Sequence, residues 1–391
     1  MTDLKQTYSP GSASSKAIVV LLPLILCSDF SANSQAAAEK KITLLFIGDI
    51  MGHEEQIWSA ENRSTHTFSY DTVFSFIKPE IEEADIAIAN LEAPLGGRPY
   101  SGYPAFSSPD ALAVACKNAG IDCLVTANNH SADRKENGIL HTLHVLDSLG
   151  ISHTGTFSDQ AERKALNPLM IEKYGITLAL LNYTYGTNGI SVNKPVIVNT
   201  IEKSVIEKDL AAARKKNPDL IIVFIHWGTE YDTIPSSKQY ETGSFLFENG
   251  VDLVIGSHPH VLQKMIREKN AGNGRGRLTV FSLGNFVSNQ RKRHTDGGAI
   301  ARIEITKRNG SAIITDADYY LTWVYTPIVN FRKNFYILPC SRFENKASFF
   351  TDTAQYKMMM SFINDSRLLL YKQNVNFNEM IYNGSSWLLF H

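Results

Sequence analysis

The sequence predicts an α/β fold with a mainly parallel sheet, and two observations carry this prediction. Between residues 41 and 276, short apolar segments alternate with longer amphipathic ones. The segment 219–225 is apolar at almost every position, which is typical of a strand covered on both faces. Strands of this kind that alternate with helices form β-α-β units, so their strands run parallel.

The expected elements follow from the period of the apolar residues and from the Gly and Pro residues that mark their ends. Strands are expected at residues 42–47, 85–89, 121–126, 178–181, 219–225, 252–256 and 278–282. Helices are expected at residues 71–83, 109–120, 137–149, 201–216 and 239–249. Pro79 is expected to break or kink the first of these helices, because it lacks a backbone N–H.

The pattern changes after Gly276. Residues 299–306 and 311–325 flank Asn309-Gly310, a dipeptide typical of a tight hairpin turn. Helices are no longer placed between the strands, so antiparallel strands are expected here. Residues 351–371 again have a helical pattern.

Composition is that of an ordinary globular protein. Hydrophobic residues make up 43% and charged residues 20% of the 391 residues. The formal net charge is −1, so nothing favours nucleic acid as a partner. Length and pattern indicate three parts: a signal segment with a short linker at 1–40, a main domain at 41–326, and a partly helical C-terminal extension at 327–391.

The N-terminal segment has the pattern of a secretory signal. Basic residues precede an apolar run at 17–27, which is shorter than the roughly 20 residues of a membrane-spanning helix, and small residues follow it. Two processing routes stay open: cleavage near Ala38, or acylation of Cys27 as in a bacterial lipoprotein, although Leu26 is larger than the residue usual before such a cysteine. An unprocessed N-terminal anchor is a third alternative. We expect export to the bacterial cell envelope, in the periplasm or anchored by lipid, with membrane contact only through this signal or lipid.

Polar residues of the types that bind metals follow five of the predicted strands. They are Asp49 with His53 nearby, Asn90 and Glu92, Asn128 to His130, His226, and His258 with His260. The carboxyl ends of parallel strands meet at one edge of a sheet, so these side chains are expected to lie together. Buried carboxylates and imidazoles are costly unless paired, and a cation gathers them. The sequence therefore predicts a metal site at this edge.

The ligand types narrow the choice of ion. Carboxylate, amide and imidazole groups without thiolate favour Mn, Fe or Zn. The donors are numerous enough to hold two divalent ions, with one carboxylate bridging them. Two ions about 3.5–4 Å apart can clamp a phosphoryl group and activate a water for attack.

The motifs also resemble those of a known family. Gly-Asp, Asn-Leu-Glu, Asn-Asn-His, His-Trp-Gly, Gly-Ser-His-Pro-His and Leu-Gly-Asn-Phe occur in this order between about residues 42 and 324. This order resembles the CapA/PgsA capsule-synthesis family, which is linked to poly-γ-glutamate capsules and has the calcineurin-like metallophosphoesterase fold. The resemblance implies an α/β fold in which two mixed β-sheets pack as a sandwich flanked by helices, with metal bound at the strand ends.

The resemblance further implies roles for single residues. The implied metal ligands are Asp49, Glu92, Asn129, His226, His258 and His260. His130 looks like the histidine that protonates the leaving oxygen in the phosphoesterases. Two positions depart from the usual phosphoesterase pattern: His53 lies four residues after Asp49 where Asp-x-His is usual, and Asn90-Leu-Glu92 replaces Gly-Asp. Glu92 is the candidate bridging ligand, and Asn90 either binds metal or orients Glu92.

Other residues are candidates for supporting roles. Asp133 follows His130 by three residues, so it either hydrogen-bonds that imidazole as a second catalytic residue or caps the next helix. Glu230 either supports the ligands or the substrate, or is a solvated loop residue. Asn285 either faces the site or belongs to an ordinary Gly-Asn turn. His53 and Asn90 join Glu230 and Asn285 as candidates near the metal or substrate.

Two functions are consistent with these observations. The first is an exported metal-dependent hydrolase-like enzyme that attacks a phosphoester or amide-type bond in an envelope polymer during capsule or poly-γ-glutamate synthesis. The alternative is a non-catalytic envelope protein that binds or helps to export an anionic capsule polymer. Both imply an anionic polymer or phosphoester as ligand and a capsule-synthesis membrane complex as partner.

Overall fold

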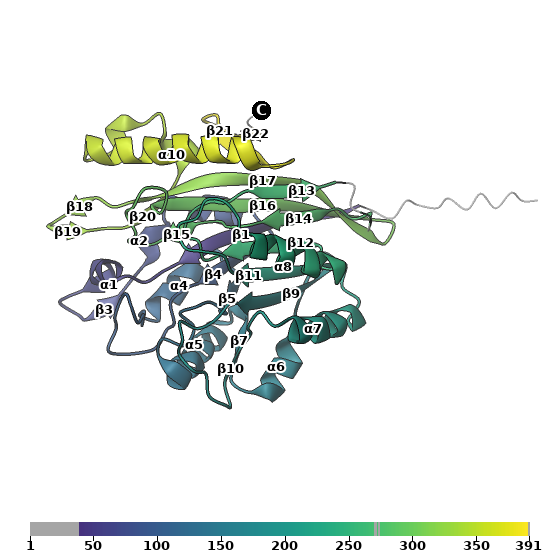
Figure 1. Ribbon diagram of the computed structural model, residues 1–391. Helices are drawn as coiled ribbons and strands as arrows, with labels where there is room; N and C mark the ends of the chain where they lie inside the picture. The colour runs from purple at the N-terminus through teal and green to yellow at the C-terminus, as the bar shows by residue number, and fades with distance from the viewer. Residues whose placement is uncertain (1–38, 270–271, 273, 390–391) are drawn as a thin grey trace, which may run out of the picture. The chain divides into compact units, whose positions relative to one another are not determined.

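Two β-sheets that pack face to face form the centre of the protein (Figure 1). The computed structural model describes residues 39–269, 272 and 274–389. Cys27 and Ala38, where the two expected processing routes act, lie outside the described residues. Among the helices of the described part, none has the length and apolar character needed to cross a membrane.

The larger sheet contains ten strands. Its main path runs through β22 (Trp387–Leu389), β21 (Asn378–Tyr382), β17 (Ser311–Tyr325), β16 (Gly297–Arg308), β1 (Lys40–Ile50), β4 (Ile86–Leu91), β5 (Cys123–Val125) and β6 (Ser152–Thr154). In addition, β15 (Asn285–Val287) pairs with β1, and β20 (Tyr336–Pro339) pairs with β17. The strands β1, β4, β5 and β6 are parallel, whereas β16 is antiparallel to both β1 and β17.

The smaller sheet contains six strands. Their order is β13 (Met265–Glu268), β14 (Arg277–Val280), β12 (Leu253–Ser257), β11 (Leu220–His226), β9 (Ile176–Thr184) and β8 (Leu169–Lys173). The four strands from β14 to β9 are parallel, and the two edge strands are antiparallel to their neighbours. Both sheets are therefore mixed.

Helices cover the outer faces of the two sheets. The larger sheet packs against α2 (Asp71–Phe74), α3 (Lys78–Glu82), α4 (Ala111–Asn118) and α5 (Lys135–Leu149). The smaller sheet packs against α7 (Lys203–Lys215) and α8 (Ser237–Glu248). The long helix α10 (Thr353–Gln373) lies along β17 (Figure 1). The shorter elements are α1 (Glu54–Ala60), α6 (Gln160–Leu166), α9 (Cys340–Phe343), η1 (Ala347–Phe349), β2 (Glu61–Asn62), β3 (Thr67–Phe68), β7 (Thr156–Phe157), β10 (Ile197–Val198), β18 (Ile328–Val329) and β19 (Arg332–Lys333).

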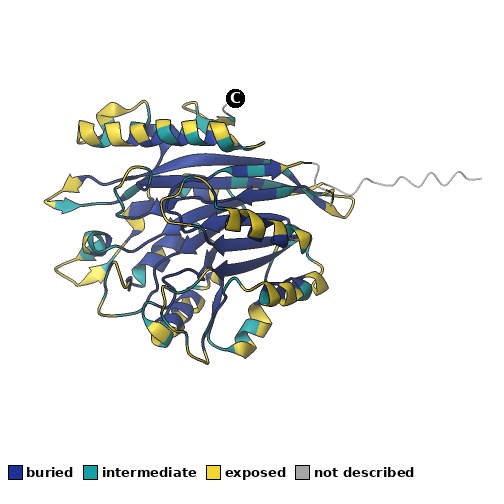
Figure 2. Ribbon diagram, viewed as in Figure 1, coloured by how far each residue is buried: buried dark blue, intermediate teal, exposed yellow. Residues whose placement is uncertain are grey.

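Strand β1 shows how the core holds the sheets together. Its residues Leu44 and Phe46 face the smaller sheet, and the alternate residues Leu45 and Ile47 face the helices. The rings of Phe46 and Phe224 lie 6.5 Å apart across the two sheets. Each fully buried side chain of this size contributes about 1.5–3 kcal/mol to folding. The strands in both sheets are buried along most of their length (Figure 2), so their carboxyl ends are held on a rigid base.

The sandwich of two mixed sheets flanked by helices is confirmed, and so is the hairpin at Asn309-Gly310, where both residues have positive φ, 51° and 81°. The helix expected at 71–83 is two short helices, α2 and α3. Pro79 lies in the first turn of α3, where the missing N–H is harmless. The strand expected at 178–181 is longer, because β9 continues to Thr184.

The chain after residue 326 contributes to the larger sheet. Strand β20 pairs antiparallel with β17, and β21 pairs parallel with it. Residues of α10 join the same apolar cluster as β17, among them Phe362 and Ile363. The expected division of the chain at residue 326 stays a prediction, and strands from both sides of it share one sheet.

Candidate metal centre

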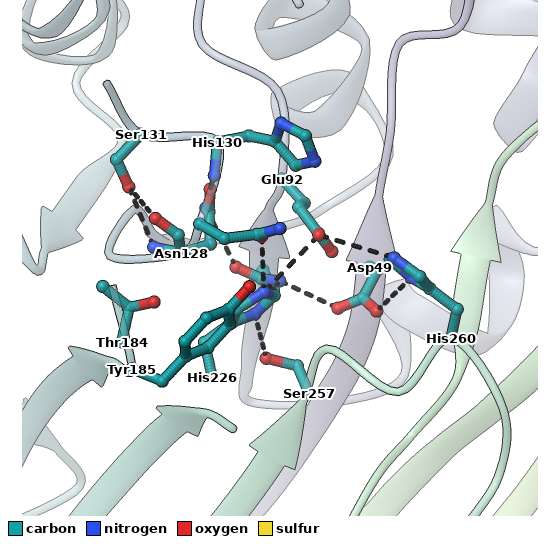
Figure 3. Close-up of polar contacts among 12 residues, drawn as sticks. Asp49, Glu92, Asn128, His130, Ser131, Thr184, Tyr185, His226, Ser257 and His260 are labelled. Carbon is teal, nitrogen blue, oxygen red and sulfur yellow. Dashed lines mark hydrogen bonds and ion pairs between the residues drawn. The ribbon is translucent and has the colours of Figure 1, made fainter. Parts of the chain in front are cut away.

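The carboxyl ends of strands from both sheets meet at one edge of the sandwich (Figure 3). In the larger sheet, Asp49 at the end of β1 is in register with Asn90 of β4. In the smaller sheet, His226 at the end of β11 is in register with Ser257 of β12. The five predicted strand ends thus divide between two sheets rather than lining one, and the packing of the sheets brings them together.

Asp49 is placed by a close approach of two backbone segments. A Cβ atom on Gly48 would lie 2.2 Å from the carbonyl oxygen of Gly284, so only glycine fits there. The Asp49 carboxylate accepts a hydrogen bond from Asn90 Nδ2 at 2.8 Å, and its other oxygen lies 3.2 Å from His260 Nδ1. Burial by itself would raise the pKa of Asp49, but the hydrogen bond and charge of His260 lower it below its usual value.

His258 and His260 lie on a turn with an unusual backbone. Their φ angles are 99° and 58°, in the left-handed region that side chains other than glycine rarely adopt. His260 Nδ1 faces two acceptors, Asp49 and Asn285 Oδ1 at 3.1 Å, so it keeps a proton, and Nε2 is the nitrogen that would bind a cation in exchange for its own proton. Burial lowers the pKa of His260, but the charges of Glu92 and Asp49 raise it to about 9.

Glu92 lies at the middle of the group. Its side chain is fully buried, and neither carboxylate oxygen has a hydrogen-bond partner among the described residues. Oε1 lies 3.5 Å from His226 Nε2 and 3.7 Å from His260 Nε2. Burial and the charge of Asp49 raise the pKa of Glu92 well above its usual value. A buried carboxylate without a partner is costly, and a cation between it and the imidazoles removes that cost.

His226 and Asn129 provide a second set of donor atoms. His226 Nε2 lies 2.8 Å from Asn129 Oδ1, and its Nδ1 lies 2.9 Å from Ser257 Oγ. Burial lowers the pKa of His226 to about 3, and burial with the neighbouring His226 and His260 lowers that of His258 to about 2. His258 Nδ1 has no hydrogen-bond partner in the described part of the chain. Both rings are therefore neutral, which is the form that binds metals.

The donor atoms form overlapping groups that fit cations. In each group the ligand atoms lie within 4.8 Å of one another. The groups are Glu92, His226 and His258; Asp49, Glu92 and His260; and Glu230, His258 and His260. Glu92 is shared by the first two groups, which is the arrangement expected of a carboxylate that bridges two ions. Glu230 is the exposed member of the third group.

His130 and Asp133 form a pair beside this centre. His130 Nδ1 lies 2.8 Å from Asp133 Oδ2, and that oxygen also accepts the backbone N–H of Phe106 at 2.8 Å. The alternative that Asp133 caps the next helix is wrong, because α5 begins after Arg134 and has no side-chain cap. The edge of the Phe106 ring packs against His130, with centroids 4.6 Å apart. The imidazole ring of His130 is thus held by its Nδ1 atom, and its Nε2 atom stays free.

Three other candidates, His53, Asn90 and Asn285, lie beside the centre. His53 Nδ1 accepts the backbone N–H of Asn289 at 3.2 Å, and His53 is in none of the donor groups found among the described residues. Burial lowers the pKa of His53 to about 4. Asn90 orients Asp49 rather than Glu92, because its Nδ2 donates to the Asp49 carboxylate. Asn285 does face the site, through its contact with His260.

Sequence reasoning missed a sixth strand end. Because β9 continues to Thr184, Tyr185 lies at the same edge as His226 (Figure 3). The Tyr185 ring centroid lies 4.6 Å from that of His258. Extending the strand past 181 to its next polar residues would have indicated this position. Burial, with the charges of Glu230 and Glu92, raises the pKa of Tyr185 to about 12, so its hydroxyl stays protonated.

Comparison with known proteins identifies a family and several relatives of this chain. The sequence model described as "Bacterial capsule synthesis protein PGA_cap" matches residues 43–290, a span that contains every candidate ligand. The chain belongs to the PGA_cap family. Its relatives in this family include the capsule biosynthesis protein CapA of Bacillus anthracis, 27% identical over 324 residues that cover 76% of this chain and 74% of the relative. The PGA biosynthesis protein CapA of Bacillus subtilis (strain 168) is 25% identical over 329 residues, covering 79% and 81%.

Solved structures resemble this PGA_cap protein only loosely. A phosphatase from Mycoplasma pneumoniae is 16% identical, with 73% of this chain and 95% of that chain covered and a TM-score of 0.43. The calcineurin-like phosphoesterase YfkN from Bacillus subtilis is 11% identical, with 85% and 98% covered and a TM-score of 0.42. The fold is defined by the sheet topology of the chain itself.

Proposed function

We propose that this PGA_cap protein is an exported, metal-dependent hydrolase-like enzyme of capsule synthesis. One observation carries the proposal: donor atoms from strand ends of both sheets surround Glu92, a fully buried carboxylate without a hydrogen-bond partner among the described residues. A folded protein tolerates such a group when a cation compensates it. The substrate in this proposal has a phosphoester or amide-type bond and belongs to an anionic envelope polymer such as poly-γ-glutamate.

The residues present fit two divalent ions. One would be held by Asp49, Glu92 and His260, and the other by Glu92, Asn129, His226 and His258. Oxygen and imidazole donors without thiolate suit Mn, Fe or Zn. When bound, such ions supply Lewis-acid polarisation of the bond to be cleaved.

The protein's own groups supply orientation and a proton. Asn90 and Asn285 hold Asp49 and His260 in place, and Ser257 holds His226. Asp133 fixes the His130 ring so that Nε2 can carry a proton to the leaving group. Because His130 is buried beside Phe106, water competes little for this proton.

The test measures metal content first and turnover second. Purified protein should contain close to stoichiometric divalent metal and should hydrolyse a generic phosphodiester faster with added Mn²⁺. His258→Ala should lose most of the metal and the activity, whereas His144→Ala, which changes an exposed histidine of α5, should lose neither. Metal content near zero in the wild type, unchanged by His258→Ala, would overturn the proposal.

Export is part of the same proposal. The pattern of residues 1–40 supports it, and so do the names of the two relatives, a capsule biosynthesis protein and a PGA biosynthesis protein. Mass spectrometry of the mature protein should find either a new N-terminus near Glu39 or a lipid on Cys27. An intact Met1 on protein recovered from the cytoplasm would contradict export. Co-purification from membranes would test whether a capsule-synthesis complex is its partner.

A second candidate is a non-catalytic envelope protein that binds or helps to export an anionic capsule polymer. Two observations favour it: His53 is not among the converging donors, and His226, His258 and His260 are each at most 3% exposed. In this case polymer binding should persist in His130→Ala, and a panel of esters and amides should show no turnover. Loss of binding only together with catalysis would count against it.

A further inference from the structure

We infer that Asn188, in the segment between β9 and β10, is a positioning residue of the metal centre. It holds the side-chain amide of Asn129 so that the oxygen, and not the nitrogen, faces the cation position. The inference rests on the proposed function. It adds a residue outside the donor groups that affects the affinity of the site for metal.

An amide ligand needs such a partner. The oxygen and nitrogen of an asparagine side chain have almost the same size, but only the oxygen can bind a cation. Asn129 Oδ1 lies 2.8 Å from His226 Nε2, and Asn129 Nδ2 donates to Asn188 Oδ1 at 3.3 Å. If the Asn129 amide turned over while Asn188 kept its own orientation, two oxygens would face each other at Asn188, and a nitrogen would replace the ligand oxygen. Asn188 therefore disfavours the orientation that cannot bind metal.

The same oxygen of Asn188 has a second partner. The Tyr185 hydroxyl donates to Asn188 Oδ1 at 3.4 Å. The Tyr185 ring is nearly parallel to the His226 ring, with an interplanar angle of 10° and centroids 6.3 Å apart, and it also lies against His258. One side-chain oxygen thus links a ligand amide to the aromatic ring that covers two ligand imidazoles (Figure 3 shows Tyr185 over His226).

The backbone at this position also suits asparagine. Asn188 has a φ of 51°, in the left-handed region that asparagine tolerates better than most other residues. The turn is closed by the backbone N–H of Ile190, which donates to the Thr187 carbonyl at 2.8 Å. At its start, the Tyr185 N–H donates to the carbonyl of the ligand His226 at 3.0 Å. Main-chain and side-chain hydrogen bonds therefore join this segment to the proposed metal centre.

The experiment compares matched variants by metal affinity. Asn188→Gly removes the side chain and keeps the positive φ, whereas Asn188→Asp keeps an oxygen acceptor. Asn193→Gly is the control: Asn193 is an exposed asparagine of the same segment, but its Nδ2 donates to Glu136 Oε1 of α5 at 2.7 Å, away from the centre. Metal-free full-length protein is titrated with Mn²⁺ or Zn²⁺ in a calorimeter, and the thermal midpoint of each metal-free variant is recorded.

Asn188→Gly should weaken metal binding by about 10- to 100-fold, as expected for loss of a group that orients a ligand, with little change in the metal-free midpoint. Asn188→Asp should retain most of the affinity, and Asn193→Gly should match the wild type. Equal affinity in Asn188→Gly and wild type would overturn this inference alone. A wild type that takes up no metal would overturn both this inference and the proposed function.

Discussion

Glu92 is a buried carboxylate that lies between two imidazoles and has no hydrogen-bond partner in the described part of the chain. Without a cation, its charge is unfavourable there, because burial and the charge of Asp49 both raise its pKa. The same features make it a strong ligand once a cation is bound. Stability of the metal-free protein and affinity for metal should therefore respond in opposite directions to removal of this charge.

Glu92→Gln tests this opposition. The substitution keeps the shape and removes the charge, so the metal-free variant should be as stable as the wild type or more stable. The stabilisation by added metal should be lost, because affinity falls by 10-fold or more, as is usual when a metal site is disturbed. Thermal unfolding with and without chelator measures both effects. A metal-free variant that is less stable but binds metal normally would contradict the role of Glu92.

Asp133→Asn tests the pair beside the centre. Asparagine can still accept the Phe106 N–H, but it no longer holds His130 with a carboxylate. Turnover should fall by about 10- to 100-fold, within the range that proton transfer contributes in enzymes. The metal content should not change, because Asp133 is in none of the donor groups of the described residues. A loss of metal equal to the loss of activity would show that the residue supports ligands instead.

At the scale of elements, the ends of β1, β11 and β12 position the ligands through backbone contacts that leave no room for side chains. The Asp49 N–H donates to the Gly284 carbonyl at 3.1 Å, so the segment before β15 lies directly against the end of β1. In β12, a Cβ atom on Gly256 would lie 2.1 Å from the Phe281 carbonyl oxygen, which accepts a hydrogen bond from Trp227 Nε1 at 2.9 Å. Trp227 is therefore a packing residue.

Gly48→Ala should disturb both the fold and the centre. The added Cβ would meet the Gly284 carbonyl oxygen, and overpacking of this kind costs about 1–3 kcal/mol. Gly186→Ala is the matched control, because nothing lies within 4 Å of its Cβ position. Urea unfolding should show a lower midpoint for Gly48→Ala alone. Equal midpoints for the two variants would mean that the β1 end can move away from Gly284.

At the scale of the whole molecule, the C-terminal residues are joined to the rest by an ion pair as well as by strands. Glu80 of α3 is buried, and its carboxylate lies 2.6 Å from Arg342 Nε of α9. Burial raises the pKa of Glu80 more than the charge of Arg342 lowers it, so it reaches about 7. The folded protein therefore holds this proton more tightly than the unfolded chain does.

This contact should make stability depend on pH. The pKa of Glu80 rises from 4.5 to about 7 on folding, so its stabilising effect is complete below pH 4.5 and is lost as pH rises through 7. Glu80→Gln should flatten the fall in the free energy of unfolding between pH 5 and 8, as measured by urea unfolding of metal-free protein at each pH. An identical pH dependence in the variant and the wild type would assign the effect to another group.

The sequence alone determined the element types and the hairpin turn, and it named the candidate metal ligands. These depend on local patterns: apolar period, Gly and Pro at element ends, and polar residues directly after strands. Local patterns also named Asp133 and Asn285 as candidates, but they left two alternatives for each. The alternatives concern which distant residue each side chain contacts, and no local pattern contains that information.

Only the tertiary structure decided those contacts. Sheet packing brought the ends of β1, β4 and β5 next to the ends of β11 and β12, which belong to the other sheet. The same packing placed Asp133 against His130. It also brought Tyr185 and Asn188 to the centre. The physical reason is that the hydrophobic effect is not directional. An apolar strand must be buried, but many similar strands could pair with it or cover its hydrophobic face. The choice among partners depends on the packing of the whole chain, and this choice brought the candidate ligands together.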